Sequence, residues 1–406
     1  MKPARTGVAG PPSRSWTAFM VRGQWPMSIY GASEILRDAR RRPHISPADG
    51  PLDTVTGEAA ATMTATIYDV AALAGVSIKS VSRVLNRGPN VSAKLEAKVL
   101  AAVESLDYRP NLSARALAGA SSYLIAAFVD AELTLEHWRS GRGNDYLSRL
   151  EYGALVECRK AGYHLMVELV DYGSPSLESW LLALLRSLKP DGVLLTPPNS
   201  DDPRVLEILE RNGTPFVRLG AEVDLDRGMR VFMDDRQAAE DMTAHLIALG
   251  HRRIGFITGP GSYAASRKRR EGFEAAMERH GLEIDRGLIV EGDFTFDSGR
   301  RAGTAILSRA ERPTAIFASN DDMALGVLNA AAALGVATPA ALAVCGFDDT
   351  PSAMLSTPPL TTIRQPVAEM AAAATRLLLP SSAGRPGHAE RVDYTLVDRF
   401  STHPAG

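Results

Sequence analysis

The sequence has few of the features that indicate a secreted or membrane protein. Its 406 residues include only two cysteines, Cys158 and Cys345, which is too few for a framework of disulfide bonds. It has no run of about 18 uncharged apolar residues, the length that a transmembrane helix needs. Nothing between Met1 and Met27 joins a basic start to the apolar stretch of a secretory signal. We therefore expect a cytoplasmic protein that has no membrane partner.

The sequence also lacks the short motifs of common catalytic and metal sites. It contains no Gly-x-Ser-x-Gly elbow, no Gly-x-x-x-x-Gly-Lys phosphate loop and no Cys-x-x-Cys pair. His245 and His251 are six positions apart, whereas two histidines on one helical face need a spacing of four. We expect no catalytic residue, no metal site and no cofactor.

The net charge of −2 is small because regions of opposite charge offset one another. Residues 1–62 hold eight basic and five acidic side chains, residues 63–120 hold seven and four, and residues 121–406 hold 30 and 38. The three regions therefore carry net charges of +3, +3 and −8. A short basic module beside a large acidic one is typical of a protein in which only one part meets a polyanion.

Residues 1–62 are expected to be a disordered N-terminal extension. They contain seven prolines and six glycines and no lasting apolar periodicity. Met63 opens the first well-patterned segment, so we hypothesise that the native chain starts there. N-terminal sequencing of the protein made from its own promoter tests this hypothesis.

Residues 63–110 begin with the pattern of two helices joined by a tight turn. Thr66 is a good N-cap residue, and the helix after it ends at Gly75, which can adopt a positive φ. Ser77 can cap a second helix over Ile78–Asn86. A helix, a glycine turn and a second helix form the geometry that lays the second helix in the major groove of DNA.

A third helix is expected from the Ser92 cap to about Leu106, and it closes a small core. The inward-facing residues at helical spacing are expected to be Val70, Leu73, Ala74, Val81, Val84, Leu85, Leu95, Val99, Val103 and Leu106. The residues of the second helix that remain outside this core are Ile78, Lys79, Ser82 and Arg83.

These residues resemble the DNA-binding headpiece of the lactose-repressor (LacI/GalR) family. The resemblance is carried by TIYDVAALAGVSIKSVSRVLN at 66–86, YRPN at 108–111 and ALA at 116–118. It implies that Ile78 and Lys79 select the operator and that Arg83 reads a base or clamps a phosphate. The chemistry agrees, because lysine can donate to guanine and isoleucine can meet a thymine methyl. The further DNA contacts that we expect are Ser77, Ser82 and Asn86.

Simpler interpretations of some headpiece residues stay open at this point. Ser77 can be a plain N-cap as well as a phosphate contact, and Ile78 and Lys79 can be an exposed helix end. Residues 111–120 are expected to form a hinge helix that is too short to persist alone in water. In the family this hinge folds on operator DNA, which implies that Asn111, Ala114 and Leu117 contact DNA and that Leu117 enters the minor groove. Otherwise Leu117 is a linker residue packed on the next domain.

Residues 121–406 alternate between strand and helix patterns, which predicts parallel sheets covered by helices. The pattern runs once before about Asp224 and once after it, so we expect two doubly wound, interleaved subdomains with a cleft at the strand carboxyl ends. The expected strands are 123–129, 164–170, 192–195, 216–219, 254–257, 315–318 and 341–346. The expected helices are 146–161, 176–188, 236–249, 266–280, 298–308 and 322–334.

Several stretches of this module resemble the effector-binding and dimerisation core of the same family, which has the type I periplasmic binding protein fold. They are AHLIALGH at 244–251, RREGF at 269–273, EGDF at 291–294, ASNDDMALG at 318–326, GFDD at 346–349 and PLTTIRQ at 359–365. The resemblance implies that Arg269, Asn320 and Asp348 bind an effector and that Phe294 is an aromatic wall. Asp130 and Tyr146 are expected on the opposite wall. An arginine, an amide and a carboxylate can bracket neighbouring hydroxyls, so a sugar is the expected effector.

Each effector residue also has a structural interpretation. Arg269 can form a surface salt bridge, Asn320 can be a helix N-cap, Asp348 can belong to a capping turn, and Phe294 can be ordinary core.

We expect a transcriptional regulator, a repressor, that binds a pseudo-palindromic operator as a homodimer. Some members of the family have leucine heptads at the end of the chain that form tetramers. Here the corresponding region holds a single strand-like stretch at 392–397, so we expect dimers. The alternative is a sugar-binding or chemosensory protein with no DNA role.

Overall fold

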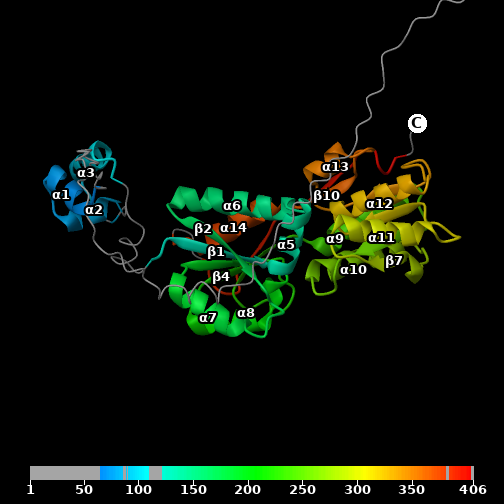
Figure 1. The fold of residues 1–406 in the computed structure, drawn as a ribbon, viewed down its shortest axis with the longest axis horizontal. Coiled ribbons are helices and arrows are strands. Elements are labelled where there is room, and N and C mark those ends of the chain that lie inside the picture. The colour runs from blue at the N-terminus through cyan, green and yellow to red at the C-terminus, as the bar shows by residue number, and fades with distance from the viewer. Residues whose placement is uncertain (1–64, 86–87, 89, 109–120, 381–383, 404–406) are drawn as a thin grey trace, which may run out of the picture. The chain divides into compact units, whose positions relative to one another are not determined.

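The computed structural model describes residues 65–85, 88, 90–108, 121–380 and 384–403 (Figure 1). Our expectations for the extension at 1–62 and for the hinge at 111–120 lie outside the described residues. Within the described ranges, no helix has both the length and the apolar character that a bilayer-spanning segment needs.

The headpiece has three helices over residues 65–108, as the sequence predicted. They are α1 (Ile67–Ala74), α2 (Ile78–Leu85) and α3 (Ala93–Ser105). The Thr66 amide and hydroxyl both donate to the Asp69 carboxylate, at 2.8 and 2.7 Å, which fixes the start of α1. Gly75 ends α1 with a φ of 63°, a conformation that favours glycine. The Ser92 Oγ accepts a hydrogen bond from the Leu95 amide and so caps α3.

The headpiece core is small, and one residue that we expected in it lies outside. Val70 is fully buried, but the Leu73 side chain is 55% exposed, so the prediction for Leu73 was wrong. At about 100° per residue, the buried face of α1 centres between Ala71 and Ala74, and Leu73 falls more than about 90° away from that centre. The buried residues of this core are Val70, Ala71, Ala74, Val81, Val84, Val99, Ala102 and Tyr108.

The larger module contains a first, six-stranded sheet in the order β11-β5-β4-β3-β1-β2. All its strand pairs are parallel. The strands are β1 (Leu124–Asp130), β2 (His164–Val170), β3 (Gly192–Leu195), β4 (Phe216–Leu219), β5 (Met229–Phe232) and β11 (Ala389–Arg391). Figure 1 shows α6 and α14 on one face of this sheet and α7 and α8 on the other. The helices of this subdomain are α5 (Ala131–Ser140), α6 (Asp145–Ala161), α7 (Leu177–Leu188), α8 (Pro203–Asn212) and α14 (Val367–Leu378).

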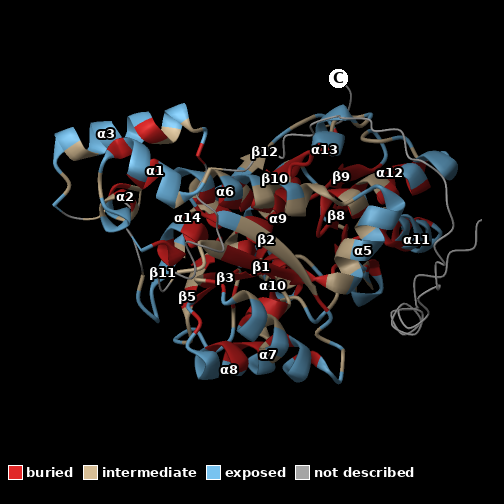
Figure 2. Ribbon diagram, turned by 60° about the vertical axis from the view of Figure 1, so that its left-hand side comes forward, coloured by how far each residue is buried: buried red, intermediate tan, exposed pale blue. Residues whose placement is uncertain are grey.

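The second sheet has four parallel strands in the order β7-β6-β8-β9. They are β6 (Ile254–Thr258), β7 (Ile289–Glu291), β8 (Ala315–Ala318) and β9 (Ala343–Cys345). Its helices are α9 (Asp235–Ala248), α10 (Ala264–Arg279), α11 (Phe296–Leu307), α12 (Asp321–Ala333) and α13 (Pro351–Leu355). Short 3-10 turns lie at η2 (Asn199–Asp201) and η3 (Arg286–Leu288). Buried residues gather in the strands and on the inner helix faces (Figure 2).

The two subdomains are interleaved, but the division that we expected near Asp224 was wrong. β5 follows Asp224 and still pairs with β4, so the chain leaves the first subdomain only between β5 and α9. It then returns, because α14 packs on α6 and β11 pairs with β5. The expected strand at 392–397 is shorter, β12 (Thr395–Val397), and it pairs antiparallel with β10 (Thr362–Arg364). The edge strand β11 of the first sheet follows all four strands of the second sheet in the sequence. No single position in the chain therefore separates the two subdomains.

The predicted strand and helix bounds agree with the structure to within two residues at almost every end. Strands β2, β3, β4 and β8 have the predicted bounds. The elements that the sequence pattern did not reveal are α5, α8, α13, α14, β5, β7, β10, β11 and the two 3-10 turns. Three of these strands have only three residues, too few for an alternating pattern. The α8 helix did carry a signal, because Asp202 caps it and a proline follows at its first position.

Candidate functional site

The headpiece presents one face of α2 outward. Val81 and Val84 are buried against the other helices, because they lie three positions apart on one side of α2. Lys79 and Arg83 are exposed on the opposite side, and the Ile78 side chain is 40% exposed beside them. Ser82 is partly buried. The exposed face of α2 therefore combines two cations with an apolar group at the helix start, which is a chemistry that suits base edges and phosphates.

Ser77 has an observed structural role. Its Oγ accepts a hydrogen bond from the Ser80 amide at 3.2 Å, so it caps α2 as the simpler interpretation proposed. This bond leaves Ser77 exposed, and its contact with a phosphate stays a prediction. The other expected DNA contacts, Asn86, Asn111, Ala114 and Leu117, lie outside the described residues.

A cavity of about 140 Å³ lies where the strands of both parallel sheets have their carboxyl ends. All six residues expected to bind an effector line it: Asp130, Tyr146, Arg269, Phe294, Asn320 and Asp348. They come from the last residue of β1, from α6 and α10, and from the loops that follow β7, β8 and β9. Parallel strands direct these loops to one edge of each sheet, so residues more than 200 positions apart meet in one cavity.

Arg269 is held in place from three sides. Its Nε donates to the Asp235 carboxylate at 2.8 Å, and its Nη1 donates to the Ser319 carbonyl at 2.6 Å. Its guanidinium lies 3.5 Å from the centre of the Phe347 ring, a favourable cation–π distance. The residue is only 4% exposed, so its interpretation as a surface salt bridge was wrong. A guanidinium oriented in this way presents its remaining N–H groups in fixed directions.

Asn320 and Phe294 have structural roles and also line the cavity. The Asn320 side chain caps α12 by accepting from the Met323 amide at 2.9 Å, and its amide nitrogen donates to the Phe294 carbonyl at 2.9 Å. Each end of an amide can form one further hydrogen bond. Phe294 is a buried core residue with a φ of 65°, and its ring still borders the cavity. Both residues are therefore structural and accessible to a ligand.

Asp348 lies in a strained loop that a cation from the first subdomain supports. Its φ is 119°, a left-handed conformation that is uncommon for a residue with a side chain. The Arg149 guanidinium donates to the Asp348 carbonyl at 2.7 Å and also to the Asp349 carbonyl. Because Arg149 lies on α6, this contact joins the two subdomains behind the cavity.

Tyr263, which was not among the residues expected from the sequence, joins the two walls of the cavity. Its hydroxyl donates to the Asp130 carboxylate, and its ring meets the Phe294 ring edge-on at a centroid distance of 5.2 Å. Burial, followed by the charge of Asp130, raises the pKa of Tyr263 well above its ordinary value. The hydroxyl therefore stays protonated and keeps its donor role. A tyrosine just before α10 gave no pattern from which this contact could be predicted.

The cavity is rich in carboxyl groups. Its described lining includes five aspartates, Asp130, Asp145, Asp235, Asp322 and Asp348, against one arginine. Burial, followed by the Asp145 charge, raises the pKa of Asp322 to about 6. Burial likewise raises the pKa of Asp348 well above its ordinary range, although the Arg269 guanidinium lowers it. Such a lining accepts hydrogen bonds from hydroxyl or ammonium groups and repels anions.

Outside the cavity, the described residues include one group of side chains that could hold a metal ion: His245, Asp398 and His403. From the sequence, His245 was compared only with His251 as a possible metal pair. The spacing of a helical pair does not reveal partners that lie about 150 positions further along the chain. This group makes no part of the cavity lining.

Comparisons with known protein families give one match for the headpiece and another for the α/β core. Residues 66–111 match the family of bacterial regulatory proteins of the lacI type, and residues 243–402 match the periplasmic binding protein-like domain. The chain is 33% identical to the HTH-type transcriptional regulator DegA of Bacillus subtilis, covering 84% of this chain and 99% of DegA. It is 36% identical to the ribose operon repressor of Escherichia coli, covering 78% and 92%.

Solved structures give the same result. The lac repressor dimer bound to operator and the anti-inducer ONPF superposes with a TM-score of 0.68 at 28% identity, covering 83% of this chain and 99% of that one. A complex of the transcriptional regulator CelR with cellobiose gives a TM-score of 0.63 at 29% identity, with the same coverage. The headpiece, the interleaved α/β core and these relatives together show that the chain belongs to the LacI family of bacterial transcriptional regulators.

Proposed function

We propose that this protein is a repressor that binds a pseudo-palindromic operator as a homodimer. A small effector that enters the cavity would either lower or raise the affinity for this operator. In this proposal α2 reads the major groove through Ile78, Lys79 and Arg83, while Ser77 and Ser82 contact phosphates. The observation that carries the proposal is the coexistence, in one chain, of an exposed basic α2 face and a cavity between two sheets whose lining includes carboxylate, guanidinium and amide side chains. The relative solved on its operator is a dimer, which supports two headpieces on two half-sites.

The effector that we propose is a small, uncharged polyhydroxylated molecule, a sugar or a sugar derivative. Arg269 and Asp348 would bracket neighbouring hydroxyls, Asn320 would offer both a donor and an acceptor, and the Phe294 ring would cover an apolar sugar face. Asp130 and Tyr146 would complete the opposite wall. The excess of carboxyl groups in the cavity supports a ligand without negative charge. Among the relatives, a ribose operon repressor and a cellobiose complex support the same class.

The coupling between the two sites would pass through the hinge at 111–120. An effector that closes the two subdomains would change the spacing of the hinges in the dimer and so favour or disfavour their folding on DNA. Asn111, Ala114, Leu117 and Asn86 would contact DNA in the folded state. A coupling free energy of about 1–3 kcal/mol is sufficient for a switch of this kind. We further propose that the protein acts in the cytoplasm and has no enzymatic activity, because its relatives are regulators.

The test has two steps. A thermal-shift screen of sugars and nucleobases identifies the effector, because a ligand at 100 times its dissociation constant adds about 2.7 kcal/mol of stability. A gel shift with the DNA upstream of the gene then measures operator binding with and without that ligand. Sequence-specific retardation supports the repressor. Ligand binding with no retardation on any candidate operator favours a sugar-binding protein without a DNA role.

A further inference from the structure

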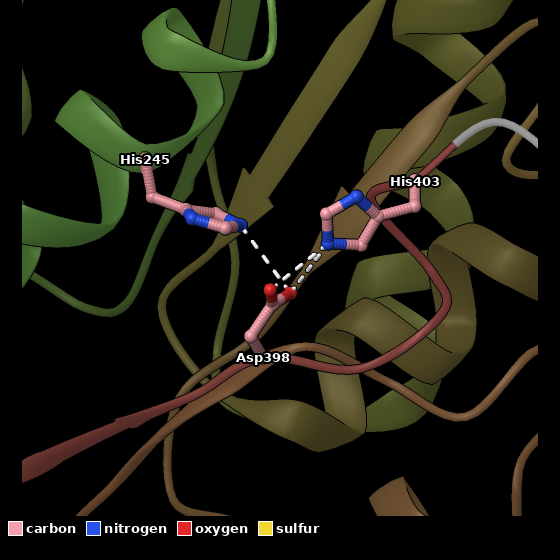
Figure 3. Close-up of side chains that lie close together, drawn as sticks. All are labelled: His245, Asp398 and His403. Atoms are coloured by element: carbon pink, nitrogen blue, oxygen red, sulfur yellow. Dashed lines mark hydrogen bonds and ion pairs between the residues drawn. The ribbon is translucent and has the colours of Figure 1, made fainter.

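Two neighbouring side chains late in the sequence meet a third, about 150 positions earlier, at the end of helix α9. His245 lies in the last turn of α9, whereas Asp398 and His403 lie in the segment that follows β12. The His403 Nε2 lies 2.9 Å from both Asp398 carboxylate oxygens, and the His245 Nε2 lies 3.5 Å from Oδ1. In Figure 3 the two rings lie on either side of the carboxylate, and a nitrogen of each ring is directed at it. The three candidate ligand atoms all lie within 4.8 Å of one another.

These distances are close to those that a single metal ion requires. Metal–nitrogen and metal–oxygen bonds of about 2.0–2.2 Å in a tetrahedron place neighbouring ligand atoms about 3.4 Å apart. The separation of 3.5 Å between His245 and Asp398 fits this value, and the contact of 2.9 Å between His403 and Asp398 would open slightly. The His403 side chain is 42% exposed and the Asp398 side chain is 44% exposed, so further positions are open to water.

A buried pair of threonines backs the site. The Thr361 and Thr402 hydroxyls lie 2.9 Å apart, and both residues are fully buried. The Thr402 hydroxyl lies 3.5 Å from the His245 Nε2, and the Thr361 hydroxyl lies 3.5 Å from the Asp398 Oδ1. The neighbouring Ser401 anchors this segment by donating to the Val344 carbonyl at 2.6 Å. The Thr361 hydroxyl, which donates to the Asp398 carboxylate, and the anchored Ser401 therefore hold the Asp398 side chain against packed structure, as metal ligands need.

We propose that His245, Asp398 and His403 bind one divalent transition-metal ion, with zinc as the representative, and that solvent completes its coordination. Two imidazoles and one carboxylate form a donor set that suits zinc, cobalt or nickel better than the oxygen-seeking ions calcium and magnesium. The position of His245 at the carboxyl end of α9 also favours a cation, because the helix dipole is negative there. The ion would fasten the C-terminal segment to α9, since its ligands come from both.

The experiment uses the full-length, tag-free chain after treatment with a chelator. Zinc titration by calorimetry should give one site that is lost or weakened more than about tenfold in His403→Gln and Asp398→Asn. Saturating zinc should raise the Tm by about 4 °C in the wild type and much less in these variants. Cobalt(II) should give a visible absorption spectrum that reports nitrogen and oxygen ligation. The matched control is His164→Gln, an exposed histidine at the start of β2, which should bind zinc as the wild type does.

The His403 side chain is 42% exposed, so His403→Gln should keep the fold, and circular dichroism checks this. The proposal is overturned if the wild type binds no zinc in the titration. It is equally overturned if His403→Gln and Asp398→Asn bind zinc as tightly as His164→Gln. Operator binding does not enter either readout, so this outcome is independent of the proposed repressor function.

Discussion

The headpiece and the cavity between the two sheets place their polar side chains in opposite ways. In the headpiece, eight buried apolar residues form the core, and the described candidate DNA contacts Ser77, Ile78, Lys79 and Arg83 are exposed. In the cavity, Arg269 and Asp235 are themselves buried and hydrogen-bonded to each other. Surface contacts can be changed with little cost in stability, whereas removing a member of a buried pair leaves an uncompensated charge. Recognition of DNA and recognition of an effector should therefore respond to mutation in different ways.

The largest effect is expected for Arg269→Ala. It removes the partner of the buried Asp235 carboxylate, so the free energy of unfolding should fall by about 3–5 kcal/mol, measured by urea denaturation. Effector binding should be lost as well. The control is Arg301→Ala, whose side chain is 64% exposed and which should change stability by less than about 0.5 kcal/mol. Equal losses in the two variants would contradict the contrast between buried and surface polar groups.

Lys79→Ala should separate binding from stability in the headpiece. Lys79 is exposed on α2, so its removal should leave the unfolding free energy unchanged to within about 0.5 kcal/mol. Operator affinity should fall by about 1–3 kcal/mol if Lys79 contacts a guanine, measured by fluorescence anisotropy at one fixed salt concentration. Lys98→Ala, an exposed lysine on α3, is the matched control. An equal loss in both variants would indicate general charge attraction in place of base reading.

Asp322→Asn should reveal a cost of the acid-rich cavity. Because burial raises the pKa of Asp322 from 3.8 to about 6, the folded state holds this proton more tightly than the unfolded chain does. The group thus destabilises the fold progressively as the pH rises between those two values, and fully above them. The stability of Asp322→Asn relative to the wild type should therefore increase by about 1 kcal/mol from pH 5 to pH 7.5.

The control for that pH dependence is Asp297→Asn. Asp297 is likewise in the first turn of a helix, but its side chain is 59% exposed. If both variants show the same pH dependence, burial is not the cause.

The smallest effect is expected for Leu73→Ala. The residue is 55% exposed, so its truncation should lower headpiece stability by less than about 0.5 kcal/mol. Val70→Ala, at a fully buried position of the same helix, should cost more than about 1 kcal/mol. Thermal unfolding of both variants tests the comparison. A large loss of stability in Leu73→Ala would contradict this placement and indicate that Leu73 belongs to the headpiece core.

The headpiece and the alternation of strands and helices were predictable because their signals are local. Thr66, Gly75 and Ser92 are start and stop signals that act within a few residues of themselves. The crossovers between the two subdomains were not predictable in this way. The pairing of β11 with β5 joins Arg391 to Phe232, and nothing in either short strand specifies a partner that far away.

The cavity shows the same limit. The resemblance to the family supplied Arg269, Asn320 and Asp348, and the structure brings them together. It did not supply Asp235 or Tyr263, whose roles depend on contacts with Arg269 and Asp130 across the fold. Whether a carboxylate meets an arginine or a tyrosine meets an aspartate is decided by tertiary packing, which local patterns do not encode.

The most direct test of the central claim is the affinity of one labelled operator for the protein, measured with and without the effector at fixed salt. The claim predicts that saturating effector changes this dissociation constant by about 5–150-fold. Asn320→Ala, which removes a cavity side chain without unpairing a buried charge, should bind the operator but lose most of this change. An effector that binds the wild-type cavity while the operator affinity stays the same would contradict the claim.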